Sequence, residues 1–325
     1  MSPRVLCLGE ILFDCLANQI GKPYEAVDSW TPYPGGAPAN VACALVKLGT
    51  SAGFVGCVGL DDPGDRLVQL LEEVGVDRSG IQRHPTAPTR QVYVVRRLDG
   101  DREFAGFGDF DTREFADTGL QAQSLPENLF ESADFLVTGT LEMAYPDSRR
   151  AIAKARELAQ KHGVRVLIDV NWRPVFWQDV ALAKQTIRES IETADFVKLS
   201  DEESQWLFET IDATRVAKHL PQVRGILVTR GSQGCSYCFG NIAGDLPAFS
   251  VEAQDTTGAG DGFSAGFVHQ LCLQGLDVLN DTDTVRDIVE YASAVGALTA
   301  TKPGAIASQP TAKDVDRFLT KTNSP

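Results

Sequence analysis

Short apolar runs that suit buried strands alternate with amphipathic helical stretches along most of this chain. Val5–Gly9 reads as a strand, and residues 38–48 follow as a helix that ends at Gly49. Residues 54–58 and 63–74 repeat this unit. Alternation of this kind predicts an α/β fold with a largely parallel sheet flanked by helices. The length of 325 residues suggests about two structural units.

Two stretches interrupt the alternation. Residues 13–33 contain two prolines and no convincing helix, and residues 89–111 read as a hairpin with Asp99-Gly100 at its turn. Both stretches lie between core elements, so we expect them to form a small sheet that stands off the main domain. The predicted division assigns residues 1–12, 34–88 and 112–325 to a large α/β domain, and residues 13–33 and 89–111 to the small sheet.

The chain is acidic, with 30 Lys and Arg against 44 Asp and Glu and a net charge of −14. Such a chain repels phosphate backbones and anionic lipid, so nucleic acid and membrane surfaces are poor partners. An anionic ligand would need local cations or backbone N–H groups. No segment approaches the roughly 20 apolar residues that cross a bilayer, and the first twelve residues do not resemble a secretory signal. We therefore expect a cytoplasmic protein.

The most informative stretch is Asp-Thr-Thr-Gly-Ala-Gly-Asp-Gly at residues 255–262, directly before an apolar helical run. Glycines at a helix start leave N–H groups for a phosphate or a developing negative charge, at the positive end of the helix dipole. The same field favours the ionised form of Asp261, which could accept a proton from an attacking hydroxyl. A capped helix start, with Asp255 and Thr256 or Thr257 as N-cap residues, fits the stretch equally well. No Lys follows the glycines, so this is not a Walker A motif.

A second glycine pair, Gly35-Gly36, opens another helix. The N-terminus of that helix and the side chain of Asn40 could bind sugar hydroxyls, although a tight turn with Pro38 near the first helical position explains the same residues. Asp14 lies just past the first strand, where open α/β sheets bind ligands. A solvated loop carboxylate is the simpler interpretation there.

These motifs occur in an order and at spacings that resemble the ribokinase-like (PfkB) sugar kinases. The matching residues are Gly35-Gly36 with Asn40, the pattern Gly56-x-Val58-Gly59-x-Asp61-x-x-Gly64, and Asp255 to Asp261. The resemblance covers about residues 4–320. It implies ATP-dependent phosphorylation of a sugar hydroxyl, and a doubly wound, mostly parallel sheet flanked by helices with a small β-sheet lid. The two irregular stretches fall where that lid is expected.

The resemblance also assigns roles to individual residues. For catalysis it implies Asp261 as the base, an anion hole at Gly258, Ala259 and Gly260, and Arg173 near the phosphate. For the sugar it implies Asp14, Gly35, Gly36, Asn40 and Asp261, joined by Arg90 on the first lid strand. For the nucleotide it implies Lys198, Thr229, Gly231, Gly234, Gly258, Gly260 and Ser293. For cations it implies Glu203 in the Mg²⁺ water shell, and Asp255, Thr257 and Gly304 beside a monovalent cation such as K⁺.

Three positions depart from the family pattern. Ser200 stands where many members have Asn, although Glu203 is kept. Ser293 replaces an Asn near the adenine pocket, which leaves the nucleotide preference open. Gly108 falls where related kinases often carry an Arg suited to an acidic sugar, which weakens a 2-keto-3-deoxygluconate substrate.

Within the family the chain most resembles the fructokinases, in Gly9-Glu10-x-x-x-Asp14, in Asp169-x-Asn-x-Arg173 and in Trp177. The expected reaction is phosphorylation of D-fructose by ATP and Mg²⁺ to give fructose 6-phosphate. 2-Keto-3-deoxygluconate kinase, ribokinase, nucleoside kinase and a non-catalytic sugar or nucleotide sensor remain alternatives. An open lid sheet has unpaired edges, so we expect a homodimer that pairs through the lid.

Overall fold

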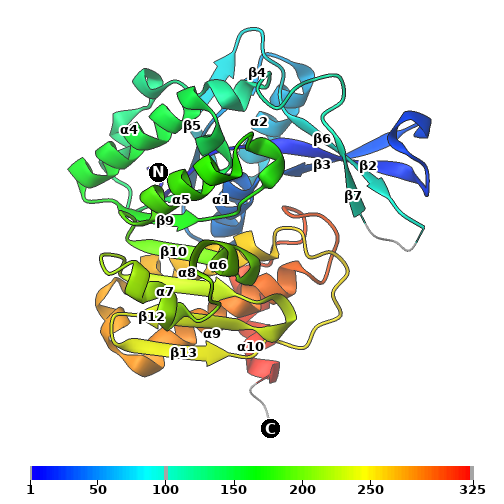
Figure 1. Cartoon of the computed structure of the whole chain (residues 1–325). Helices are drawn as coiled ribbons and strands as arrows, with labels where there is room; N and C mark the ends of the chain where they lie inside the picture. Colours follow the sequence, from blue (N-terminus) through cyan, green and yellow to red (C-terminus); the bar gives the residue numbers. More distant parts are fainter. Residues whose placement is uncertain (1, 99–101, 323–325) are drawn as a thin grey trace.

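The computed structural model describes residues 2–98 and 102–322, and a nine-stranded sheet runs through its centre (Figure 1). The strand order is β13-β12-β11-β10-β9-β8-β1-β4-β5. The parallel strands of this sheet are β1, β4, β5, β8, β9, β10 and β11. Strands β12 and β13 are antiparallel to their neighbours. This confirms the predicted mostly parallel sheet. The strands are β1 Val5–Leu8, β4 Ala52–Gly59, β5 Asp77–His84, β8 Phe135–Thr138, β9 Arg165–Asp169, β10 Phe196–Ser200, β11 Gly225–Thr229, β12 Cys235–Phe239 and β13 Ile242–Leu246.

Helices cover both faces of this sheet, as a doubly wound fold requires. The helices are α1 Ala37–Leu48, α2 Asp62–Val74, α3 Glu127–Phe130, α4 Pro146–His162, α5 Val180–Ile191, α6 Asp201–Phe208, α7 Ala213–His219, α8 Ala259–Gln274, α9 Thr282–Thr299 and α10 Ala312–Thr322. In β1, Cys7 packs into one hydrophobic core with α1 and α8, and Leu8 packs into a second core with α4 and α5. Side chains that alternate between two cores explain why the strand is apolar at every position.

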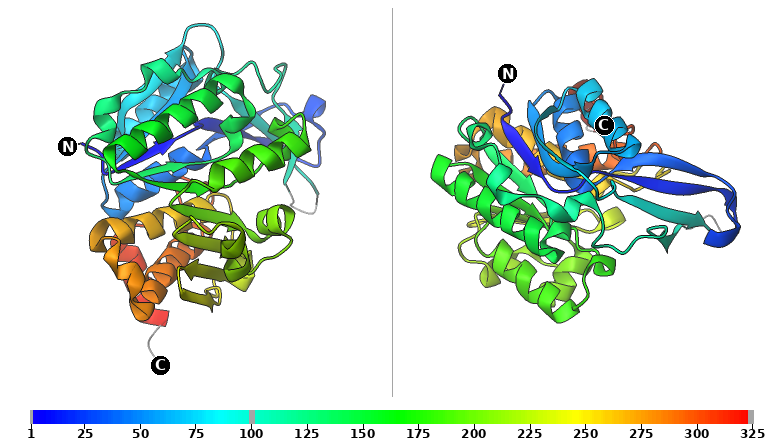
Figure 2. Two further views of the ribbon diagram at one scale, coloured as in Figure 1. Left: turned by 60° about the vertical axis from the view of Figure 1, so that its left-hand side comes forward. Right: turned by 90° about the horizontal axis from the view of Figure 1, so that it is seen from above.

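A second, four-stranded sheet has the order β3-β2-β6-β7 and projects from the main body (Figure 2). Its strands are β2 Leu12–Ile20, β3 Trp30–Gly35, β6 Gln91–Arg96 and β7 Arg102–Gly106. They come from the two stretches that interrupt the alternation in the sequence. The turn expected at Asp99-Gly100 lies outside the described residues, and the assignment of residues 13–33 and 89–111 to a lid stays a prediction.

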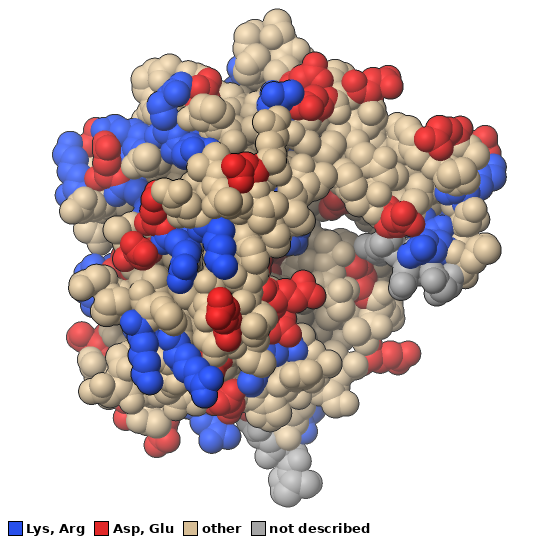
Figure 3. Space-filling model, in the orientation of Figure 1, with Lys and Arg blue, Asp and Glu red and all other residues tan. Residues whose placement is uncertain are grey.

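The two sheets meet at the edge where the parallel strands of the large sheet end. β1 ends at Leu8 and continues through a short link into β2, and β3 leads through Gly35-Gly36 into α1. The surface is hollowed between the main body and the small sheet (Figure 3). Ligands bind open α/β sheets at this edge, so the fold directs attention there. Within residues 2–98 and 102–322, the helices are too short or too polar to span a membrane.

Candidate active site

The glycine-rich bend before α8 exposes backbone N–H groups, as its sequence predicts. Gly258 has φ +80°, and a Cβ there would come within 2.8 Å of the Ala305 side chain, so glycine is required. The N–H of Ala259 donates to Thr256 O, and that of Gly262 donates to Gly258 O. The N–H groups between them, at Gly260 and Asp261, are those that a helix start leaves for an external acceptor.

Asp261 lies in the first turn of α8 and accepts a hydrogen bond from Asn40. The Asn40 Nδ2 atom donates to Asp261 Oδ2 at 2.8 Å, and Asn40 itself is buried in the first turn of α1. Burial, and then the neighbouring Asp169 carboxylate, raise the pKa of Asp261 to about 6. The sequence predicted that the helix field would favour the ionised form of Asp261. Burial and Asp169 act in the opposite direction. The raised pKa leaves Asp261 ionised at neutral pH and makes it a stronger proton acceptor.

The turn between β3 and α1 is built against the end of β1. Gly36 has φ +102°, and a Cβ there would lie 2.5 Å from Glu10 O. A Cβ on Gly35 would lie 2.7 Å from Asp14 Oδ2, which places that carboxylate beside the turn. The Glu10 side chain accepts from the Ala37 N–H at 2.9 Å. The predicted sugar-binding residues Asp14, Gly35, Gly36 and Asn40 therefore come together near Asp261.

Below the bend, a buried ion pair joins two strands to α8. Lys198 on β10 donates to Asp169 Oδ1 on β9 at 3.1 Å, and both residues are less than 10% exposed. Ser264 on α8 donates to the second oxygen of Asp169 at 2.9 Å. A Cβ on Gly260 would lie 2.9 Å from Lys198 Nζ, so the ammonium lies directly against the bend.

Glu203 and Arg173 flank this pair. Glu203 is buried at the start of α6, where one carboxylate oxygen accepts from the Trp172 N–H and the other from the Ser200 N–H. Ser200 in turn caps the helix by accepting from the Glu203 N–H, so Ser serves here as a helix cap. Arg173 is exposed, donates to Trp172 O, and acts electrostatically on Asp261.

The residues predicted to contact the nucleotide gather at the ends of β10 and β11. Thr229 ends β11 and donates to Leu199 O, and it is opposite Cys235 in the register with β12. Gly234 precedes Cys235, and a Cβ there would come within 1.9 Å of Leu246 O. Ser293 on α9 lies 3.7 Å from the Cys235 sulfur. Gly231, with φ +53°, lies in the loop that connects these strands.

The predicted monovalent-cation residues also come together. One oxygen of Asp255 accepts from the N–H and hydroxyl of Thr257, and the other accepts from the Gly304 N–H at 3.0 Å. The carboxylate thus ties the loop before α8 to the loop after α9. Within the described ranges, no group of three or more His, Cys, Asp or Glu side chains could hold a metal ion. Any cation here would depend on backbone and hydroxyl oxygens as well.

Arg90, predicted to lie on the first lid strand and to contact the sugar or phosphate, lies just before that strand and is buried. It precedes β6 and is 1% exposed, because its guanidinium makes two bonds to Asp117, at 2.6 and 2.8 Å. A third bond goes to Thr112 O. Four rings surround the group, those of Phe107, Phe115, Tyr145 and Phe176. The structure therefore does not support a contact between Arg90 and the sugar or phosphate.

Two glutamates, Glu142 and Glu10, lie near the pair of Arg90 and Asp117. The sequence interpretation assigned no role to either. Glu142 is 2% exposed, and neither of its carboxylate oxygens has a hydrogen-bond partner among the described residues. Burial, followed by Asp117 and Glu10, raises its pKa well above the usual value. Burial also raises the pKa of Glu10 to about 7. Both glutamates follow parallel strands, so their position at strand ends was the available signal.

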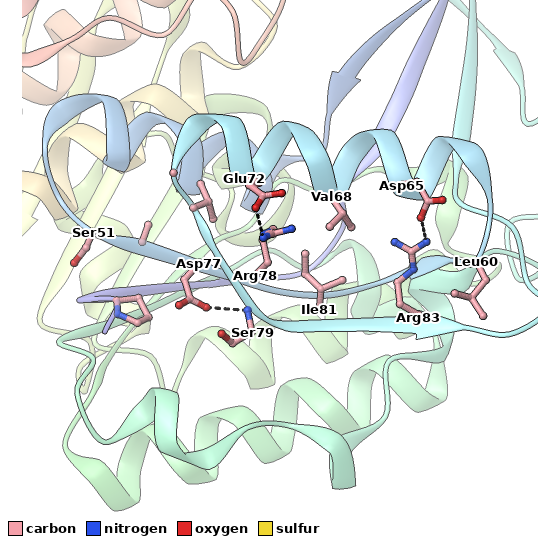
Figure 4. A pocket seen from close by; sticks show the side chains of 14 residues that line it. Ser51, Leu60, Asp65, Val68, Glu72, Asp77, Arg78, Ser79, Ile81 and Arg83 are labelled. Carbon is pink, nitrogen blue, oxygen red and sulfur yellow. Dashed lines mark hydrogen bonds and ion pairs between the residues drawn. The ribbon is translucent and has the colours of Figure 1, made fainter. Parts of the chain in front are cut away.

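A surface groove of about 900 Å³ lies elsewhere, between α2 and β5 (Figure 4). Its charged side chains are already paired, since Arg78 bonds to Glu72 and Arg83 bonds to Asp65. Its lining contains none of the predicted catalytic or binding residues. The chemistry is therefore concentrated at the start of α8.

Comparisons with known proteins agree with this geometry. Residues 2–312 match the model of the pfkB family of carbohydrate kinases. Fructokinase-1 of Oryza sativa subsp. japonica is 34% identical over 321 residues, which cover 98% of each chain. The ATP-bound fructokinase of Xylella fastidiosa superposes with a TM-score of 0.90 at 30% identity, over the full length of both chains. A double mutant of the Vibrio cholerae O395 fructokinase with bound fructose, ADP and potassium has a TM-score of 0.83 at 28% identity and covers 98% of each chain. The chain belongs to the pfkB family of carbohydrate kinases.

Proposed function

We propose that the protein is a fructokinase, which transfers the γ-phosphoryl group of ATP to the primary hydroxyl of D-fructose and yields fructose 6-phosphate. The observation that carries this proposal is the placement of Asp261, bonded to Asn40 and adjacent to the N–H groups in the first turn of α8. Fructokinases are among its relatives along nearly the whole chain. Gly108, in place of an Arg that would suit an acidic sugar, disfavours 2-keto-3-deoxygluconate.

In this mechanism Asp261 takes the proton of the attacking hydroxyl. Its pKa of about 6 keeps it ionised at neutral pH, and Asn40 fixes the orientation of its carboxylate. The N–H groups of Gly260 and Asp261 hold the negative charge that develops on the transferred group, and Lys198 adds a cation directly behind them. A non-catalytic sensor would need no proton acceptor at this position.

The nucleotide would lie across Thr229, Gly231, Gly234 and Ser293. The hydrogen-bond donors of these four residues and the N–H groups at the start of α8 suit the phosphates of ATP. Mg²⁺, when bound, would neutralise charge on the β- and γ-phosphates, with Glu203 holding part of its water shell. Asp255, Thr257 and Gly304 would support a monovalent cation such as K⁺, because oxygen-rich loops suit hard cations.

The small sheet would act as a lid and as the contact between two copies. Four large apolar side chains on or beside it are more than 45% exposed: Ile20, Leu98, Phe104 and Phe110. Apolar exposure of this kind favours burial against a partner, so we propose a homodimer through the lid. Sedimentation of the wild type and of Phe104→Glu tests this, since only the variant should be monomeric at micromolar concentration. A cytoplasmic location remains a prediction.

A panel of sugars tests the substrate. The purified protein is incubated with ATP, Mg²⁺ and one of D-fructose, D-ribose, 2-keto-3-deoxygluconate or a nucleoside, and ³¹P NMR follows the product. Of the four substrates, we expect only fructose to give rapid formation of a sugar phosphate. Asp261→Asn should lower turnover by about 10²–10⁴ while fructose binding is kept, since only the base is lost. Faster phosphorylation of another sugar, or full activity of the variant, would contradict the proposal.

A further inference from the structure

Lys198 has three acidic neighbours but bonds to only one of them. Asp169, Glu203 and Asp261 all act on its ammonium electrostatically, and the ion pair at 3.1 Å goes to Asp169. Each oxygen of Glu203 already accepts from a backbone N–H, whereas the bond from Asn40 uses only one oxygen of Asp261. A buried ammonium must be paired. If Asp169 were neutral, we infer that Lys198 would pair with Asp261, because backbone N–H groups already bond both oxygens of Glu203.

Asp169 also holds the helix that carries Asp261. Its second oxygen accepts from Ser264, which is completely buried and follows Asp261 by three residues on α8. One carboxylate therefore fixes both the cation and the first turn of the helix. A Cβ on Gly260 would lie 2.9 Å from Lys198 Nζ, so the ammonium lies directly against the bend.

We propose that Asp169 is a positioning residue that keeps the Lys198 ammonium beneath the phosphate-binding bend and away from Asp261, so that Asp261 stays free to accept the substrate proton. This inference rests on the proposed function, because it needs Asp261 as the base. Asp169 itself does not have to touch the sugar or ATP. Its second bond, to Ser264, holds the helix in register with the cation.

The charged groups around Asp261 decide which way its pKa moves. Asp169 from β9 and Glu10 after β1 carry negative charge toward it, while Lys198 from β10 and Arg173 after β9 carry positive charge. Asn40 from α1 contributes a hydrogen bond to the ionised form. Removing the charge of Asp169 should therefore lower the pKa of Asp261, and removing that of Lys198 should raise it.

The test compares Asp169→Asn with Lys198→Met in the pH dependence of kcat at saturating fructose and ATP. In the wild type, kcat falls on the acidic side as Asp261 takes up a proton. We expect Asp169→Asn to shift this limb by about one pH unit downward, and to lower kcat at neutral pH about tenfold or more, since Lys198 then blocks the base. Lys198→Met should shift the limb upward. A residue with only a structural role would not produce shifts in opposite directions.

A binding measurement provides a second readout. Calorimetric titration with ATP in the absence of sugar should show affinity about tenfold lower for Lys198→Met, and within about threefold of wild type for Asp169→Asn, because that variant keeps the cation. Ser264→Ala should lower kcat without moving the limb, since it removes a tether and no charge. If Asp169→Asn does not fold, the upward shift in Lys198→Met and the unmoved limb in Ser264→Ala decide the question.

Asp195→Asn is the matched control. Asp195 comes directly before the first residue of β10. It accepts from the Val166 N–H and pairs with Arg165 and Arg224. The same substitution there should leave kcat, the acid limb and ATP affinity unchanged. If Asp169→Asn has a normal kcat and an acid limb at the wild-type pH, the inference about Asp169 is wrong, while the proposed function stands. Full turnover by Asp261→Asn would instead overturn the proposed function.

Discussion

Asn40 Nδ2 donates to Asp261 Oδ2 at 2.8 Å, although 221 positions separate the two residues in the chain. The bond joins the first turns of α1 and α8, so the glycine turns before these helices converge on one carboxylate. The other side-chain atom of Asn40, Oδ1, is buried without a hydrogen-bond partner among the described residues. We predict that it accepts from a hydroxyl of the sugar when the substrate binds.

Replacement of Asn40 by Leu should weaken both catalysis and sugar binding. The bond to Asn40 lowers the pKa of Asp261, so its loss should move the acid limb of kcat to higher pH. We expect KM for fructose to rise about tenfold, because a hydrogen bond to the sugar is lost as well. Steady-state kinetics between pH 5 and 9 would reveal both effects. A variant with an unchanged limb would show that this bond does not tune the base.

Gly36 and Gly49 form a matched pair for the sugar-binding turn. Both have φ near +100°, but a Cβ on Gly36 would clash with Glu10 O at 2.5 Å, while a Cβ on Gly49 would meet nothing within 4 Å. Gly49→Ala should cost only the left-handed backbone penalty, about 1 kcal/mol. Gly36→Ala should cost about 1–3 kcal/mol more and should raise KM for fructose. Urea denaturation and kinetics test this, and equal losses in the two variants would contradict it.

Arg90 and Asp117 should behave as a buried ion pair. Arg90→Met leaves an unpaired carboxylate at 2% exposure, which should cost about 3–5 kcal/mol of folding free energy. The double variant Arg90→Met/Asp117→Leu should recover most of this loss, because the surrounding rings accept an apolar pair. Thermal and urea unfolding of both variants provide the measurement. The Arg150–Asp147 pair on the surface is the control, and its loss should cost less than about 1 kcal/mol.

The burial of Arg90 marks a limit of the sequence interpretation. Residues before a lid strand can face either side, and nothing near Arg90 in the chain identifies Asp117, 27 positions later, as its partner. The four enclosing rings come from separate segments. Strand β5 was likewise not predicted, because its sequence Asp-Arg-Ser-Gly-Ile-Gln-Arg-His has neither an apolar run nor alternation. It forms the edge of the sheet, where polar residues are tolerated.

The start of α8 could be predicted because local chemistry determines it. Three glycines in five positions before an apolar run specify a bend and a helix regardless of distant contacts. The same holds for the central strands, whose apolar runs bury on both faces. The network of Lys198, Asp169 and Ser264 depends on three elements far apart in the chain. Its bonds could not be deduced from spacing alone.

Glu142 should make the stability of the protein depend on pH. Its pKa is raised above the ordinary value of 4.5, so between these two values the folded state binds more protons than the unfolded state. The contribution of Glu142 to stability is then greatest below about pH 4.5 and is lost as the pH rises toward its folded-state pKa. Glu142→Gln removes this loss of stability at higher pH, because the Gln amide does not ionise.

The variant should therefore melt at a higher temperature than the wild type at pH 8, and the difference should shrink or reverse at pH 4. Calorimetry across this range measures it. Glu131→Gln, at an exposed position in the same region of the chain, is the control and should leave the melting temperature nearly unchanged at every pH. Glu10, whose pKa is about 7, adds a loss of the same sign between pH 4.5 and 7, so a slope should persist in Glu142→Gln. A wild type whose melting temperature rises from pH 5 to 8 by more than that of the variant would show that Glu142 is paired, and ionised, inside the protein.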